Sequence, residues 1–259
     1  MTRHIAVAMA KGGVGKTTTS VSLAHGLAAL GNKVLLVDCD TQNQVSLFLG
    51  IKPTHGLYEF ITGKDEKGQA VARKETLFSA RPNLWVLSGG IKLVELKNWL
   101  GEQPRDQRQT ILSNAFVTKE GALDFLIFDC APGWDVLSVN ILMAAREVVC
   151  PVALQAPAFE GLKTFFSYLL SAQKLNSALQ LRYVLPTMYD RRTRQSDALL
   201  KQLHRLFRKQ YCEPIPYNVR LPEAAGNGKT IFEHAPDSPG AAGYKKMLRR
   251  VINDEPATI

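Results

Sequence analysis

The chain has 259 residues, of which 46% are hydrophobic and 21% are charged, as in an ordinary globular protein. No apolar run approaches the roughly 20 residues that a membrane-spanning helix needs, so the composition excludes a membrane-embedded protein. The net charge of +9 favours a polyanionic partner. Four widely separated cysteines lack the spacing of zinc and iron–sulfur sites and indicate a reduced, cytoplasmic compartment: Cys39, Cys130, Cys150 and Cys212.

In chain order, short apolar runs alternate with segments of helical periodicity. Near-continuous apolar runs are typical of parallel strands that are buried on both faces. The predicted strands are Ile5–Met9, Lys33–Val37, Leu84–Leu87, Phe125–Phe128, Glu147–Val152 and Leu181–Leu185. The predicted helices cover residues 16–30, 57–62, 91–100, 105–117, 136–145, 159–174, 194–209 and 240–252. The rest of residues 50–82 is polar and predicts loops.

This alternation predicts a doubly wound α/β fold, in which one mostly parallel sheet is flanked by helices. We expect a single domain over residues 1–259, with an ordered core over about 3–252 and a short polar C-terminal tail. Ligands of such sheets bind at the carboxyl ends of the strands. The motifs described next lie at such ends, so we expect them to meet in one site.

A glycine-rich loop, Ala10-Lys-Gly-Gly-Val-Gly-Lys-Thr-Thr18, follows the first predicted strand and leads into a predicted helix. Strand, glycine loop and helix are the context of a phosphate-binding loop. Glycines let backbone N–H groups surround phosphate oxygens, and the helix start adds partial positive charge. Lys16 is placed to reach the β- and γ-phosphates, and the Thr17 hydroxyl to bind Mg²⁺. The predicted nucleotide ligands in the loop are Gly12, Gly13, Val14, Gly15, Lys16, Thr17 and Thr18.

Three aspartates lie at the ends of predicted strands. Asp38 and Asp40 follow Lys33–Val37, and Asp129 follows Phe125–Phe128. Phosphoryl transfer needs a metal ion beside the phosphates and an aligned water molecule, and carboxylates serve both purposes. A helix cap or turn is the alternative interpretation of each aspartate alone. The convergence of all three on one loop favours a nucleotide-hydrolysing site.

The loop departs from the ordinary motif, G-x-x-x-x-G-K-[ST], because Ala10 replaces its first glycine and Lys11 precedes the glycine pair. In this it resembles the deviant Walker A loop, K-G-G-x-G-K-[ST], of the ParA/MinD family of ATPases. The resemblance is to ParA/Soj-type partition ATPases and covers most of the chain. It implies a P-loop ATPase fold and an ATP-bound homodimer. In that dimer, Lys11 reaches the ATP of the partner protomer.

The resemblance also implies roles for the aspartates. Asp129 looks like the Walker B aspartate, which acts on Mg²⁺ through water, and opens a D-x-x-P-G switch that ends at Gly133. Asp38 and Asp40 resemble the family's D-x-D segment, in which Asp40 directs the attacking water and Asp38 supports the metal or the lysines. Which of the two directs the water stays open. The implied catalytic residues are Lys11, Lys16, Asp38 and Asp40, and the implied magnesium ligands are Thr17, Asp38 and Asp129.

The C-terminal third is basic. Residues 182–220 carry nine lysines and arginines against three acids, which is +6 of the total +9. In the predicted helix 194–209, four cations share a narrow stripe, and three leucines lie on roughly the opposite face. The cations are Arg194, Lys201, Arg205 and Arg208, and the leucines are Leu199, Leu203 and Leu206. The stripe suits DNA phosphates without sequence preference, and a solvated helix face is the alternative.

Two segments, residues 187–193 and 215–224, resemble stretches of ParA-type ATPases whose arginines contact DNA in the ATP-bound dimer. This implies that Arg192 and Arg220 contact DNA. The segment Pro216–Asn218 resembles the turn that packs on adenine, where Asn218 either bonds the base edge or is a turn asparagine. The complete predicted DNA-binding set is Arg191, Arg192, Arg194, Lys201, Arg205 and Arg220.

Together these features predict a slow ATPase that uses ATP and Mg²⁺ and is stimulated by a ParB-like adaptor. We expect the ATP-bound homodimer to bind non-specific double-stranded DNA and to leave it on hydrolysis, which would position a plasmid, a chromosome or a protein compartment. The protein would be cytoplasmic and nucleoid-associated, with no membrane partner. Two alternatives stay open. One is a MinD-like membrane-cycling ATPase, for which residues 253–259 are a poor anchor. The other is an ATP-binding DNA scaffold with little turnover.

Overall fold

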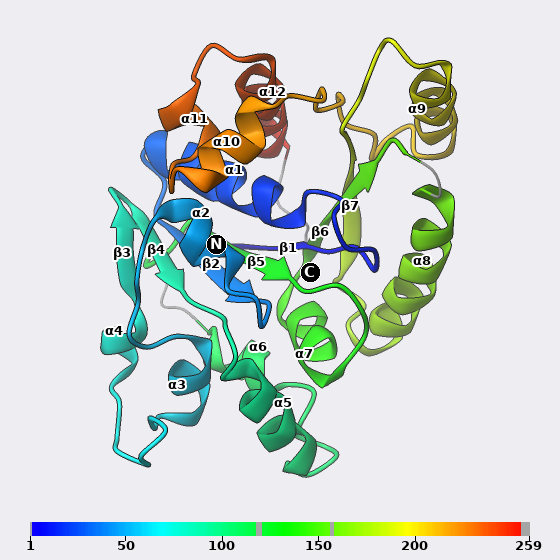
Figure 1. Cartoon of the computed structure of the whole chain (residues 1–259). Coiled ribbons are helices and arrows are strands. Elements are labelled where there is room, and N and C mark those ends of the chain that lie inside the picture. The colour runs from blue at the N-terminus through cyan, green and yellow to red at the C-terminus, as the bar shows by residue number, and fades with distance from the viewer. Residues whose placement is uncertain (1, 118–120, 156–157, 255–259) are drawn as a thin grey trace.

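The computed structural model describes residues 2–117, 121–155 and 158–254. Within them, seven strands form one sheet in the order β3-β4-β2-β5-β1-β6-β7 (Figure 1). Neighbouring strands are parallel except for β3 and β4, which are antiparallel. The predicted doubly wound, mostly parallel sheet is therefore confirmed.

The strands agree with the predicted runs to within two residues at each end, with one addition at the sheet edge. They are Arg3–Val7 (β1), Val34–Cys39 (β2), Phe78–Arg81 (β3), Leu84–Leu87 (β4), Phe125–Cys130 (β5), Glu147–Ala153 (β6) and Gln180–Thr187 (β7). The edge strand β3 was not predicted. Every residue of β2 and β5 is buried, and both strands run further than predicted. As a result Asp38 and Asp129 lie inside their strands rather than after them.

Helices cover both faces of the sheet (Figure 1). On one face they are Lys16–Ala29 (α1), Gln44–Leu49 (α2), Arg220–Gly226 (α10), Ile231–His234 (α11) and Pro239–Asn253 (α12). On the other face they are Leu57–Thr62 (α3), Leu93–Glu102 (α5), Ile111–Ala115 (α6), Val136–Ala144 (α7), Ala158–Leu175 (α8) and Arg194–Leu206 (α9). Arg73–Thr76 (α4) is a single turn near α3. The sequence did not predict α2, α4, α10 or α11.

The predicted helix over residues 105–117 is wrong in its first half, where residues 105–110 form turns before α6. Asn140 of α7 provides the physical reason. Its side-chain nitrogen donates to the Arg108 carbonyl (2.7 Å), and its side-chain oxygen accepts the Leu112 amide (3.3 Å). These are the two groups that an α-helix would join to each other, so the Asn140 side chain replaces that helical bond.

The predicted apolar face of the basic helix is only partly correct. Leu203 of α9 is fully buried and Leu199 is half-buried, but Leu206 is 60% exposed. Helix α9 ends at Leu206, three residues earlier than predicted. Leu206 therefore lies at the helix end, beyond the part of α9 that packs on the sheet.

Candidate nucleotide-binding site and basic surface

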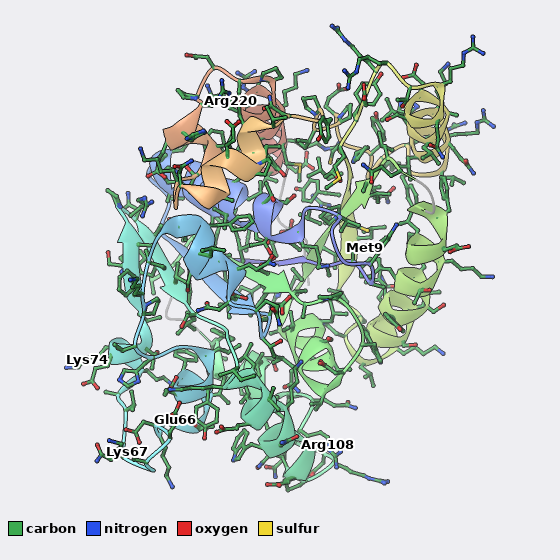
Figure 2. The ribbon with its side chains drawn as sticks, in the orientation of Figure 1. Met9, Glu66, Lys67, Lys74, Arg108 and Arg220 are labelled. Atoms are coloured by element: carbon green, nitrogen blue, oxygen red, sulfur yellow. The ribbon has the colours of Figure 1, made fainter. Side chains whose placement is uncertain are left out.

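The glycine loop lies at the carboxyl end of β1 and passes directly into α1. Met9, labelled in Figure 2, is the last buried residue before the loop. Gly13 (φ 71°) and Gly15 (φ 88°) adopt the left-handed conformation that only glycine takes without strain. Gly12 and Gly13 are exposed, and a Cβ atom at either position would meet nothing within 4 Å. The loop thus borders open space at the start of a 14-residue helix, as an anion site requires.

Lys16 is buried although it carries a charge. Its Nζ donates to the backbone carbonyl of Lys11 (2.9 Å), so its side chain spans the loop. Burial lowers the pKa of Lys16, and the charge of Asp129 opposes that shift. The Lys11 side chain is half-buried, and its Cβ lies 3.1 Å from the position that a Cβ atom on Gly161 of α8 would occupy. Both lysines are therefore on the loop, with Lys16 directed inward.

Two buried carboxylates lie side by side beneath the loop. Asp38 of β2 and Asp129 of β5 are direct partners in the strand register and are at most 1% exposed. The hydroxyl of Ser20 in α1 donates to Asp129 Oδ1 (2.8 Å). Burial raises the pKa of Asp129 to about 6, while hydrogen bonds from Thr17 and Ser20 oppose the rise. Burial and the nearby Asp129 charge raise the pKa of Asp38 well above its usual range.

Such a carboxylate pair favours a bound cation, because a cation compensates both the burial and the mutual repulsion. In the described part of the chain, no three His, Cys, Asp or Glu side chains are grouped to hold a metal by themselves. Mg²⁺ commonly uses only one or two carboxylates and takes its other ligands from phosphate and water. The Asp129 carboxylate and the Thr17 hydroxyl, which lie within hydrogen-bonding reach of each other, are oxygen groups of the kind that Mg²⁺ takes from a protein.

Asp38 and Asp40 differ in how their oxygens are used. Asp38 Oδ1 accepts the Asp40 amide (2.9 Å), and Asp38 Oδ2 accepts the Val45 amide (3.1 Å). Asp40 is half-buried, and its Oδ1 accepts the amide of Gln42 (3.0 Å). The Asp38 carboxylate therefore holds the backbone of its own turn, whereas Asp40 remains the more accessible carboxylate.

A glycine pair after β4 supports this turn and was missed in the sequence. A Cβ atom on Gly89 would lie 2.5 Å from the Asp40 carbonyl oxygen and 3.0 Å from Asp38 Cγ, which no larger residue could accept. The Gly90 amide donates to the same Asp40 carbonyl (2.9 Å). The signal was available, because two glycines closely follow the predicted strand Leu84–Leu87.

A cavity of about 230 Å³ opens beside the loop. It extends from Gly15 and Thr18 to the end of β7 and the segment before α10, and it includes the predicted Pro216 and Asn218. Asn218 Oδ1 accepts the Arg220 amide (2.8 Å), which is the contact of a turn asparagine. Tyr217 lies between Pro216 and Asn218 in the predicted segment, and the sequence did not predict the other lining residues Phe48, Thr187, Met188, Ile215, Leu221, Pro222 and Tyr244.

The predicted basic residues are all exposed, and four of the six line one of two grooves. Arg191 and Arg192 line an open groove of about 620 Å³ beside the cavity. Lys201 and Arg205 line a second groove of about 490 Å³ along α9, together with Arg208. The other two begin helices, Arg194 at the start of α9 and Arg220 at the start of α10.

Two of these arginines are engaged with acids. Arg192 Nη2 lies 2.8 Å from Asp190 Oδ2, and Arg220 Nη1 lies 2.8 Å from Glu223 Oε2. Both ion pairs are solvent-exposed, so each contributes little to stability and leaves its arginine able to exchange partners. Figure 2 labels Arg220 at the start of α10, on the outer side of the molecule.

The fold and the loop define a P-loop nucleotide-binding protein, and comparison with known proteins makes the class narrower. A family model described as an AAA domain matches residues 2–181. The chromosome-partitioning ATPase Soj of Thermus thermophilus is 37% identical over 253 residues, covering 96% of this chain and 95% of that protein. The sporulation initiation inhibitor protein Soj of Bacillus subtilis is 36% identical over 256 residues, covering 97% and 98%.

A solved structure is also similar over the whole fold. It is cobyrinic acid a,c-diamide synthase from Mycobacterium smegmatis with bound ADP and magnesium. It has a TM-score of 0.81 and 29% identity, covering 99% of this chain and 98% of that one. The chain therefore belongs to the AAA domain family, and within it to the ParA/Soj-type partition ATPases.

Among the described helices, none is both long and apolar enough to cross a bilayer. The last helix, α12, uses its apolar side within the core. Leu248 and Val251 are buried there against the face of the sheet that α1 covers.

Proposed function

We propose that this protein is a positioning ATPase whose nucleotide state controls its attachment to non-specific double-stranded DNA. One observation carries the proposal. Pro216, Tyr217 and Asn218 line both the cavity beside the phosphate loop and the open groove that contains Arg191 and Arg192. A nucleotide in the cavity would therefore contact the same segment that lines the groove of Arg191 and Arg192. Nucleotide binding and DNA binding are then linked through directly shared residues.

ATP and Mg²⁺ are the cofactors that these residues fit. The similar solved structure from M. smegmatis holds ADP and magnesium. In this chain, the loop from Gly12 to Thr18 would surround the phosphates with N–H groups, and Pro216 and Asn218 would flank the base. Thr17 and Asp129, the latter through water, would hold Mg²⁺, with Asp38 supporting it. The bound metal supplies positive charge against the phosphate oxygens.

The chain's own residues would carry out hydrolysis. The Lys16 ammonium stabilises negative charge on the transferred phosphoryl group. Asp40 orients the attacking water, because it is the more accessible carboxylate of the turn. Asp38 keeps that turn in place through its two backbone hydrogen bonds. Turnover is expected to be slow and to be accelerated by a ParB-like adaptor.

The proposed cycle depends on dimerisation. With ATP bound, two protomers would face each other, and each Lys11 would reach the phosphates of the opposite nucleotide. Closure would bring two basic surfaces onto one DNA segment, which raises apparent affinity through effective concentration. Hydrolysis would separate the protomers and release DNA. In this scheme the protein works in the cytoplasm on the nucleoid and partitions a chromosome or plasmid; the relative from T. thermophilus is named a chromosome-partitioning ATPase.

The Lys11→Ala variant tests the dimer. We expect it to bind a non-hydrolysable ATP analogue within about threefold of the wild-type affinity, because alanine retains the backbone carbonyl that Lys16 contacts. It should nevertheless stay monomeric with that analogue, while the wild-type protein forms dimers. Analytical ultracentrifugation with the analogue, with ADP and without nucleotide measures this. Dimers that persist in Lys11→Ala with the analogue would contradict the role of Lys11 across the interface.

A further inference from the structure

Thr187 joins the end of β7 to the phosphate loop. It is the last residue of β7 and is only 3% exposed. Its hydroxyl donates to the backbone carbonyl of Val14 (2.9 Å), which lies 173 positions away in the sequence. Its own carbonyl accepts the amide of Leu154, just after β6 (2.9 Å). The ends of β6 and β7 therefore fix the position of the Thr187 hydroxyl, which is hydrogen-bonded to the phosphate loop.

This bond also sets the direction of the neighbouring N–H group. In a planar trans peptide, the carbonyl of one residue and the N–H of the next point in opposite directions. Because Thr187 holds the Val14 carbonyl on the β7 side, the Gly15 N–H points away from β7. Within the described residues, no backbone acceptor takes a hydrogen bond from the Gly15 N–H. It is a donor held in a fixed direction and left for a ligand.

The methyl group of Thr187 closes the same side of the loop. Its Cγ2 lies 3.9 Å from the position that a Cβ atom on Gly15 would occupy. The next residue, Met188, has a left-handed backbone (φ 55°), uncommon for a methionine, and lines the cavity proposed for the base. The end of β7 thus supports both the phosphate loop and the wall of the cavity.

We infer that Thr187 is a positioning residue for nucleotide binding, which aims the Gly15 N–H at a phosphate oxygen. The inference rests on the proposed function, in which phosphates occupy the loop. Thr187 touches no reacting atom and acts through the Val14–Gly15 peptide. Both ADP and ATP would depend on it, because the phosphates they share lie in the loop.

The variants Thr187→Val and Thr187→Ser test this role. Valine keeps the shape and removes the hydroxyl, and we expect ADP binding, measured by calorimetry, to weaken about tenfold, as for the removal of one buried hydrogen bond. Serine keeps the hydroxyl and should restore affinity to within about twofold of the wild type. For ATP hydrolysis, KM should rise with the same factor, while kcat changes less than about threefold.

Thr76→Val is the matched control. The Thr76 hydroxyl is also buried and donates to a backbone carbonyl, that of Arg73 (2.7 Å), but it belongs to α4, away from the loop. Its removal should lower thermal stability without changing ADP affinity. ADP binding by Thr187→Val that matches the wild type would overturn the inference, as would a Thr187→Ser variant as weak as Thr187→Val.

The wild-type protein gives an independent measurement if Thr187→Val fails to fold. The Gly15 amide proton should move downfield in the NMR spectrum when ADP is added, because it gains a charged acceptor. Intact ADP binding with an unmoved Gly15 amide would overturn the role of Thr187 alone. No ADP binding by the wild-type protein would overturn the proposed function as well.

Discussion

Replacing Lys16 by alanine is expected to remove nucleotide binding, with the ADP dissociation constant rising at least about 100-fold. The buried ammonium lies within the loop, where it would make charge-assisted hydrogen bonds to phosphate oxygens. Two such bonds correspond to about two factors of ten in affinity. The variant also loses the positive charge that lowers the pKa of Asp129. Isothermal titration with ADP and Mg²⁺ measures the effect.

Lys245→Ala is the control for this experiment. Lys245 also donates to a backbone carbonyl, that of Pro236 (2.9 Å), but it is exposed on α12. Its removal should leave ADP affinity unchanged. If Lys16→Ala still bound ADP within about fivefold of the wild type, the loop would not be the phosphate site.

The second large effect is expected from Asp40→Ala. ATP binding should persist, but hydrolysis should slow by at least about 100-fold, as for removal of a group that positions or activates a nucleophile. Asp40 is chosen because both oxygens of Asp38 already accept backbone amides, whereas Asp40 is accessible. Under the proposed cycle this variant would accumulate as a DNA-bound dimer. Phosphate release at saturating ATP measures turnover.

Asp65→Ala provides the comparison. Asp65 is also a turn aspartate, whose Oδ1 accepts the amides of Lys67 and Gln69, but it lies in the loop between α3 and α4. Its removal should not affect hydrolysis. Normal turnover in Asp40→Ala would assign the water to Asp38, and an ATP-bound wild-type protein without turnover would favour a static DNA scaffold.

The sequence predicted the parts of the site that depend on local patterns. The loop from Ala10 to Thr18 is contiguous, so its glycines, lysine and following helix were recognisable together. The convergence of Asp38 and Asp129 was predictable because parallel strands end at one edge of the sheet, and the structure makes them register partners. That both carboxylates lie inside their strands was not predicted, because hydrophobic patterning stops at the first charged residue.

Long-range contacts explain most of what the sequence did not predict. Thr187 contacts Val14, and the Tyr244 hydroxyl pairs with Thr19 Oγ1 (3.1 Å), across separations of 173 and 225 residues. No local pattern marks such pairs. The same holds for Asn140, whose side chain bonds the Arg108 carbonyl and the Leu112 amide and so keeps the helix from starting before α6. The short helices α10 and α11 have only a few apolar residues each, which leaves almost no helical periodicity to detect.

Nucleotide-dependent DNA binding is the central claim, and the anisotropy of a labelled random-sequence duplex tests it most directly. We expect tight binding with ATP, weak binding with ADP or without nucleotide, and an affinity that falls steeply as salt rises. The double variant Arg192→Ala/Arg220→Ala should weaken binding. It should also make the plot of log K against log salt concentration less steep, with the slope falling by about 1 for each DNA phosphate that is no longer neutralised. Equal affinity in all three nucleotide states, or no DNA binding at low salt in any of them, would contradict the claim.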